Sequence, residues 1–108
     1  AFRWFIDQGG QWNSGWENKV TRVIPKTGVP FSPLVTAPFI KAPVLMMTGK
    51  EDEMPQIVRE VQVEVFNRVK SEKQYYEIDG GHFGAIYPHT PLFYEAIAVQ
   101  SAFIKSIT

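Results

Sequence analysis

PVLMMTGKED at residues 43–52 and QYYEIDGGHF at residues 74–83 decide the fold of this chain. The continuous apolar run in the first stretch is typical of a strand covered on both faces, and the aromatic and β-branched residues of the second favour another strand. Each run is followed within two residues by glycine and then by a side chain that can hold or move a proton. We therefore predict two strands, each ending in a loop that carries Asp52 or His82.

Helical periodicity separates and follows these two strands. Apolar residues recur at spacings of three and four over 54–70, and Pro55 stands where a proline opens a first turn, so this segment is predicted to be a helix. Thr90 is predicted to cap a last helix that begins at Pro91. The apolar stripe of that helix is predicted to comprise Phe93, Ala96, Ile97, Gln100, Phe103, Ile104 and Ile107. Residues 43–108 thus predict an α/β unit in the order strand, helix, strand, helix.

The segment at 1–42 has a different texture. Residues 1–7 are aromatic-rich and predict the tail of a helix closed by the glycine pair at 9–10, and alternation over 19–24 predicts a short strand. Five prolines within 25–43 fix φ and remove backbone donors, so we expect an extended connector with room for one helical turn. The segment is therefore predicted to be an aromatic and proline-rich cap or connector.

Composition excludes several classes of protein. The 108 residues hold 11 Lys and Arg against 11 Asp and Glu, so no summed positive field attracts nucleic acid or an anionic membrane. The absence of cysteine excludes disulfides and thiolate metal sites, and there is neither a long apolar stretch nor a leader-like segment. We expect a single modest domain or a piece of a larger one, located in the cytoplasm, without cofactor, nucleic acid or membrane as partner.

The two loops are expected to meet. Two strands joined by a helix within one sheet almost always run parallel, so the loops that follow them emerge at the same edge. Neighbouring strands lie about 4.8 Å apart, or about twice that with one strand between them, so Asp52 and His82 can reach hydrogen-bonding distance. This edge is also where open α/β sheets bind ligands.

The pair has a recognised chemical use. A carboxylate that accepts the Nδ1 proton of imidazole fixes the tautomer and leaves Nε2 free to take a proton from a nucleophile. We therefore assign Asp52 as the orienting acid and His82 as the base. Gly80 and Gly81 are expected to permit the turn and the close backbone approach that bring the ring to the sheet edge.

On these motifs, residues 43–108 resemble the C-terminal third of an α/β-hydrolase, the sheet of which they would form in part. In that family the acid lies three residues after a glycine at a strand end and the histidine follows the last core strand, as Gly49 to Asp52 and Gly80 to Phe83 do here. The sequence motif Gly-Gly-His-Phe-Gly at residues 80–84 and the aromatic segment at residues 1–42 favour the esterase, dienelactone-hydrolase-like and X-prolyl-peptidase-like branches of the family. The resemblance implies hydrolysis of an ester or a peptide.

The sequence departs from the family in its nucleophile. It contains no Gly-x-Ser-x-Gly elbow, no oxyanion-hole segment and none of the earlier core strands. None of the serines has the elbow's flanking glycines; these are Ser14, Ser32, Ser71, Ser101 and Ser106. The chain starts at Ala1 rather than Met, which is compatible with processing or with a missing N-terminal portion. We expect no turnover from this chain alone.

Plainer interpretations exist for the same residues. Asp52 and its neighbours Glu51 and Glu53 suit the N-terminus of any helix, and either glutamate is an alternative to Asp52 as the acid. His82 suits a glycine turn without a catalytic role. Asp79 joins Asp52 and His82 in a chemically permitted metal site, although no ligand spacing in the sequence supports one.

Other aromatic and titratable residues have structural interpretations. His89, between a proline and a threonine, is expected to be exposed and structural. The tryptophans of the first segment suit a core or contact surface as well as a substrate pocket; these are Trp4, Trp12 and Trp16.

Two hypotheses from different classes follow. In the first, the chain is the C-terminal portion of a serine hydrolase and supplies Asp52 and His82 to a serine on a missing N-terminal segment. In the second, it is a free-standing, non-catalytic binding or dimerisation module that retains hydrolase-like loops. Because a small sheet leaves apolar faces and strand edges uncovered, we expect homodimers unless the missing segment is present.

Overall fold

The structure, a computed structural model, describes residues 2–9, 15–17, 19 and 31–108. The chain forms two compact units, residues 1–31 and residues 32–108. Within the described residues no helix has the length and apolar character that crossing a membrane requires.

The first unit contains the helix α1, Phe2–Gly9, which confirms the helix predicted there. The Trp16 ring lies directly over Gly9, in the space that a side chain at this position would occupy. A hollow of about 460 Å³ is lined by Trp4, Phe5, Gln8, Gly9 and Trp16. Trp4 and Trp16 therefore share a surface, whereas Trp12 and most of the strand predicted at 19–24 lie outside the described residues.

Two strands form the centre of the second unit. β1, Val44–Gly49, and β2, Lys73–Ile78, pair in parallel, with Val44 opposite Lys73 and Gly49 opposite Ile78. Both predicted strands and their parallel direction are confirmed. Among the described residues the sheet has no further strand, so β1 and β2 are direct neighbours and each has one open edge.

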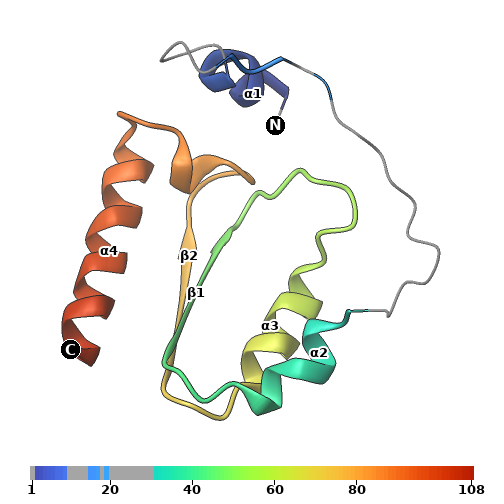
Figure 1. Cartoon of the computed structure of the whole chain (residues 1–108), viewed down its shortest axis with the longest axis vertical. Coiled ribbons are helices and arrows are strands. Elements are labelled where there is room, and N and C mark those ends of the chain that lie inside the picture. The colour runs from blue at the N-terminus through green and yellow to red at the C-terminus, as the bar shows by residue number, and fades with distance from the viewer. Residues whose placement is uncertain (1, 10–14, 18, 20–30) are drawn as a thin grey trace. The chain divides into compact units, whose positions relative to one another are not determined.

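Helices cover the two faces of this sheet (Figure 1). The helix α4, Pro91–Ile107, lies on one face, where Phe103 and Ile104 share a hollow with Leu45 and Met47 of β1. The helix α3, Arg59–Arg68, lies on the other face together with the short helix α2, Pro33–Thr36. Met46, between Leu45 and Met47 in β1, points toward these two helices. The alternation of side chains along β1 thus serves both layers, as expected of a strand in an α/β unit.

α3 begins later than the periodicity predicted. Its N-cap is Val58, and Pro55 lies in a turn closed by the Ile57 N–H and the Met54 carbonyl at 3.2 Å. Gln56 has a φ of 74°, a left-handed conformation that a helix cannot contain. The prediction of a helix over 54–70 with Pro55 in its first turn is therefore wrong at its start. The first apolar residues of that spacing, Met54 and Ile57, instead lie in the loop at residues 50–58 between β1 and α3, which carries Asp52 and is called the acid loop below.

α4 confirms the predicted cap and corrects the predicted stripe. Thr90 Oγ1 accepts a hydrogen bond from the Phe93 N–H at 3.2 Å, and the helix begins at Pro91. Ala96 and Phe103 are buried on the sheet. The rest of the row is less covered, with exposed fractions of 43% for Ile97, 56% for Ile104 and 39% for Ile107. A sheet of two strands is too narrow to cover the whole stripe.

Residues just before β1 pack on α3 and belong to the second unit. α2 and the short helix η2, Ala37–Phe39, occupy the part of the proline-rich connector for which one helical turn was expected. The Arg68 guanidinium donates to the Leu34 carbonyl at 3.1 Å, and the Ser71 hydroxyl to the Ala42 carbonyl at 2.7 Å. The division between the units consequently falls at Phe31 and Ser32, ahead of the change in sequence texture at residue 43.

Polar side chains of β2 form hydrogen bonds with the helices on both faces of the sheet. The Arg59 guanidinium forms two hydrogen bonds with the Glu77 carboxylate, at 2.7 and 2.8 Å, and this pairing raises the pKa of Arg59. The Tyr76 hydroxyl donates to Glu95 at 2.6 Å, which raises the pKa of Tyr76. α3 is thus tied to β2 at Glu77 and α4 is tied to it at Tyr76.

Lys73 joins the start of β2 to the end of α3. Its ammonium donates to the carbonyls of Phe66, Asn67 and Val69 at 2.9, 3.0 and 2.7 Å. It also lies 4.8 Å from the centre of the Phe66 ring. The last carbonyls of a helix have no partner within the helix, so one cation satisfies several acceptors there and opposes the negative end of the helix dipole.

We predict that Lys73→Met lowers the free energy of unfolding by about 1–3 kcal/mol, because it leaves these carbonyls without their charged donor. Urea unfolding monitored by circular dichroism measures the change. Lys70→Met is the matched control, because Lys70 is exposed and its substitution removes the same charge. It should change the free energy of unfolding by less than about 0.5 kcal/mol. Equal losses in the two variants would show that charge, and not the contacts of Lys73, sets the stability.

Candidate functional site

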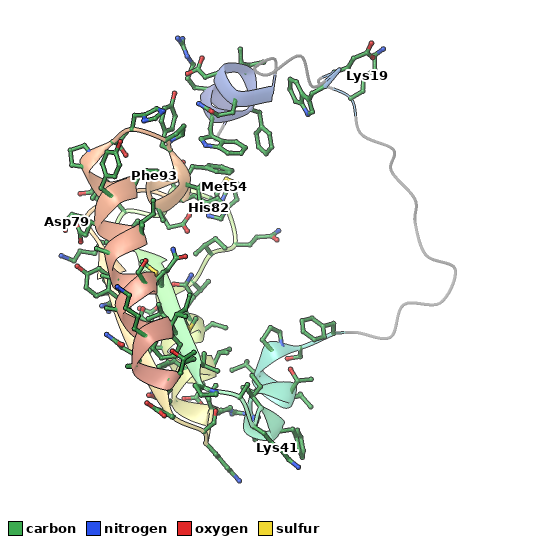
Figure 2. The ribbon with its side chains drawn as sticks, turned by 60° about the vertical axis from the view of Figure 1, so that its left-hand side comes forward. Lys19, Lys41, Met54, Asp79, His82 and Phe93 are labelled. Carbon is green, nitrogen blue, oxygen red and sulfur yellow. The ribbon has the colours of Figure 1, made fainter. Side chains whose placement is uncertain are left out.

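The histidine loop, residues 79–90 between β2 and α4, is joined to the acid loop by backbone hydrogen bonds where the strands end. The Lys50 N–H donates to the Ile78 carbonyl at 3.0 Å and the Glu51 N–H to the Gly80 carbonyl at 3.1 Å. The parallel pairing thus continues past the last strand residues into the loops. Figure 2 shows the result: His82 and Met54 lie together at this end of the second unit, while Lys41 lies at the opposite end.

Glycines make this close approach feasible. A Cβ at Gly49 would stand 2.5 Å from the Gly80 carbonyl oxygen and 2.9 Å from that of Gly81, closer than backbone atoms tolerate. A Cβ at Gly80 would stand 2.7 Å from Leu92, and one at Gly81 would overlap the Glu53 carboxylate. None of these three glycines has a positive φ, so their small size matters here and not a left-handed turn.

Asp52 and His82 form the hydrogen-bonded pair that the topology predicted. His82 Nδ1 lies 2.9 Å from Asp52 Oδ2 and 3.1 Å from Oδ1. Asp52 Oδ1 also accepts the Met54 N–H at 3.0 Å, so the acid loop itself fixes the orientation of the carboxylate. The Asp52 side chain is 11% exposed and that of His82 is 33% exposed. The acid is therefore shielded while the imidazole remains accessible.

This arrangement selects one tautomer of the ring. With Asp52 ionised, Nδ1 carries the proton that is shared with the carboxylate, and Nε2 carries the lone pair. The ring's hydrogen bonds to the described residues are both made by Nδ1. Phe83 lies edge-on to the imidazole at 4.9 Å between ring centres and limits its rotation. His82 is thus oriented to accept a proton at Nε2.

The structure also separates the three neighbouring acids. Glu53 Oε2 accepts the His82 backbone N–H at 3.0 Å, and this hydrogen bond is the main reason why the pKa of Glu53 falls to about 2. Glu51 takes part through its backbone N–H. Of these three acids, Asp52 is the one whose carboxylate is hydrogen-bonded to the imidazole, so neither glutamate replaces it as the partner of the ring.

Asp79 points to a different partner. Its carboxylate accepts the Lys50 ammonium at 2.7 Å, which raises the pKa of Lys50, and Figure 2 shows Asp79 away from His82. In the part of the chain that the structure describes, no group of three or more His, Asp or Glu side chains is arranged to hold a metal ion. The metal site considered from Asp79, Asp52 and His82 is therefore not formed.

Sequence reasoning missed part of this site. The Lys50–Asp79 pair links the residues that directly follow the two strands, and parallel pairing alone could have suggested it. The contact of Glu53 with the histidine loop had no sequence signal, because it depends on the turn at Met54. His89 is exposed, as expected, and its Nδ1 lies 3.3 Å from the Tyr94 hydroxyl.

Comparisons with known protein families, with curated proteins and with solved structures found no match to this chain. The geometry of the site is therefore the basis for a functional proposal.

We predict that Gly49→Ala separates the two loops and lowers the free energy of unfolding by about 1–3 kcal/mol, because its Cβ meets backbone oxygens that cannot rotate away. Urea unfolding gives the stability, and the ring ¹⁵N shifts of His82 report whether the bond to Asp52 persists. Gly84→Ala is the control, since its Cβ would meet the ends of the flexible Ile78 and Leu92 side chains at 3.3 and 3.5 Å. Retention of the His82 shifts in Gly49→Ala would contradict the proposed role of the glycine.

Proposed function

We propose that this chain supplies the acid and the histidine of an α/β-hydrolase-type serine hydrolase that cleaves an ester or a peptide, with the nucleophilic serine on a segment outside the 108 residues. The single observation that supports it most is the hydrogen bond from His82 Nδ1 to Asp52 at 2.9 Å, formed by loops that follow two parallel strands. The residue order, acid before histidine, suits the same class of enzyme.

The proposed chemistry follows from the pair. His82 Nε2 takes the proton of the serine hydroxyl as its oxygen attacks the carbonyl carbon, and the imidazolium then gives that proton to the leaving group. Asp52 holds the Nδ1 proton and stabilises the imidazolium charge. Its low exposure strengthens this interaction, because little water competes for the carboxylate. The 33% exposure of His82 leaves room for a serine or a substrate to approach the ring.

The test is to read the coding frame upstream of Ala1 for a Gly-x-Ser-x-Gly turn and to express the longer protein. We expect a fluorophosphonate probe to label that serine. His82→Ala and Asp52→Asn should slow the labelling by about 10²–10⁴-fold, because proton removal by the oriented imidazole activates the serine. His89→Ala is the matched control, since His89 is exposed and its only described hydrogen bond is with Tyr94; labelling should be unchanged.

Two results would count against the proposal. An upstream frame without a nucleophile turn removes the serine that the pair requires. Ester hydrolysis by the purified 108 residues that is lost in His82→Ala would instead show that this chain carries its own nucleophile.

A second candidate function is that of a free-standing dimerisation module, which the exposed apolar residues of α4 support. The Ile97, Ile104 and Ile107 side chains of α4 are between 39% and 56% exposed. Beside them a hollow of about 430 Å³ is lined by Leu45, Met47, Gln100, Phe103 and Ile104. Apolar surface that continues from a helix to a sheet edge favours association.

We predict that the 108-residue chain dimerises and that Ile104→Asp raises the dissociation constant at least about tenfold, because it places a charge among apolar contacts. Sedimentation equilibrium over a range of concentrations measures this constant. Ala102→Asp adds the same charge at an exposed position on the opposite side of α4 and should leave it unchanged. A concentration-independent monomer would contradict the dimer hypothesis.

A further inference from the structure

We infer that Glu53 is a positioning residue for His82: its carboxylate holds the backbone of the histidine loop while Asp52 holds the ring. The inference rests on the proposed function and adds a second acid to it. Two consecutive residues thus fix one histidine at two points, with Glu53 Oε2 3.0 Å from the His82 backbone N and Asp52 Oδ2 2.9 Å from its Nδ1.

The two contacts have different consequences. A hydrogen bond to Nδ1 restrains the ring but allows the backbone of a glycine-rich loop to shift, with the side-chain torsions compensating. A hydrogen bond to the N–H restrains the main chain next to Cα and with it the point from which the ring projects. Together they fix where Nε2 lies, and proton transfer depends on that position to within a fraction of an ångström.

The acid loop is shaped for this second contact. The Met54 N–H donates to Asp52 Oδ1 at 3.0 Å, and this turn directs the intervening residue, Glu53, across to the histidine loop. On the opposite side, a Cβ at Gly81 would overlap Glu53 Oε2, so the carboxylate occupies space that only glycine leaves open. The absence of a side chain at Gly81 therefore makes room for the Glu53 carboxylate.

Ionisation strengthens the contact. The His82 N–H is the main cause that lowers the pKa of Glu53 from 4.5 to about 2, so Glu53 is a carboxylate at neutral pH. Hydrogen bonds to a charged acceptor are stronger than neutral ones, although water competes at this exposed side chain. Glu51, two residues before Glu53, offers a natural comparison, because it is exposed and contacts the histidine loop through its backbone N–H.

The experiment uses the full 108-residue chain labelled with ¹⁵N. In Glu53→Ala we expect exchange of the His82 amide proton with solvent to accelerate by about five- to tenfold, and the Nδ1–H tautomer preference of its ring to weaken. Glu53→Gln keeps an acceptor oxygen and should recover most of both. Glu51→Ala is the matched control and should change neither. Unchanged exchange at the β1 and β2 amides verifies that the variants remain folded.

Asp52→Asn distinguishes failure of this inference from failure of the proposed function. If Asp52→Asn abolishes the tautomer preference while Glu53→Ala leaves exchange and tautomer as in the unmodified chain, the positioning role is overturned and the proposed function stands. If neither variant alters the ring, the Asp52–His82 pair does not operate in solution and both proposals fail. Equal effects of Glu51→Ala and Glu53→Ala would assign the change to lost charge and overturn the specific role of Glu53.

Discussion

The parallel pairing of β1 with β2 is the constraint on which the rest of the structure depends. Gly49 faces Ile78 at the end of the register, so the two strands finish at the same level. The loops that follow start side by side and continue the pairing through Lys50 and Glu51. With one strand inserted between them, the separation of Asp52 and His82 would grow by about 4.8 Å, and a direct hydrogen bond would require a longer loop. The site is a consequence of adjacency in the sheet.

Glycines and acidic residues then fix the geometry of the two neighbouring loops. Gly49 and Gly81 allow backbone and carboxylate groups to approach to distances that any side chain would prevent. Asp52 and Glu53 fill the space so created with acceptors for the ring and the main chain of His82. These hydrogen bonds join the two loops directly, so each loop supports the other without a large apolar core beneath them. This matters in a unit in which few of the described residues are buried; these are Ala37, Thr48, Val69, Ile78, Ala96 and Phe103.

Much of this organisation could be read from the sequence, and the failures have identifiable causes. Strands, their direction, the Thr90 cap and the Asp52–His82 contact follow from local patterns that the tertiary structure preserves. The start of α3 could not be read, because the left-handed Gln56 interrupts an apolar spacing that continues on both sides of it. The role of Glu53 also escaped prediction, since it depends on a turn formed by the Asp52 side chain and the Met54 N–H. Periodicity records which residues are apolar, and it does not record where a side chain diverts the backbone.

The two candidate functions share one physical origin. A sheet of two strands cannot bury both helix stripes, so Ile97 and Ile104 stay exposed on α4 and β1 keeps an open edge. Further strands beside β1 would cover these groups and, in a hydrolase, would also bring the nucleophile to the edge where His82 lies. A second copy of the chain would cover them without supplying a serine. The same uncovered surface therefore serves either proposal, and the oriented Asp52–His82 pair is what favours the first, because a module that only associates has no use for an imidazole held in a single tautomer.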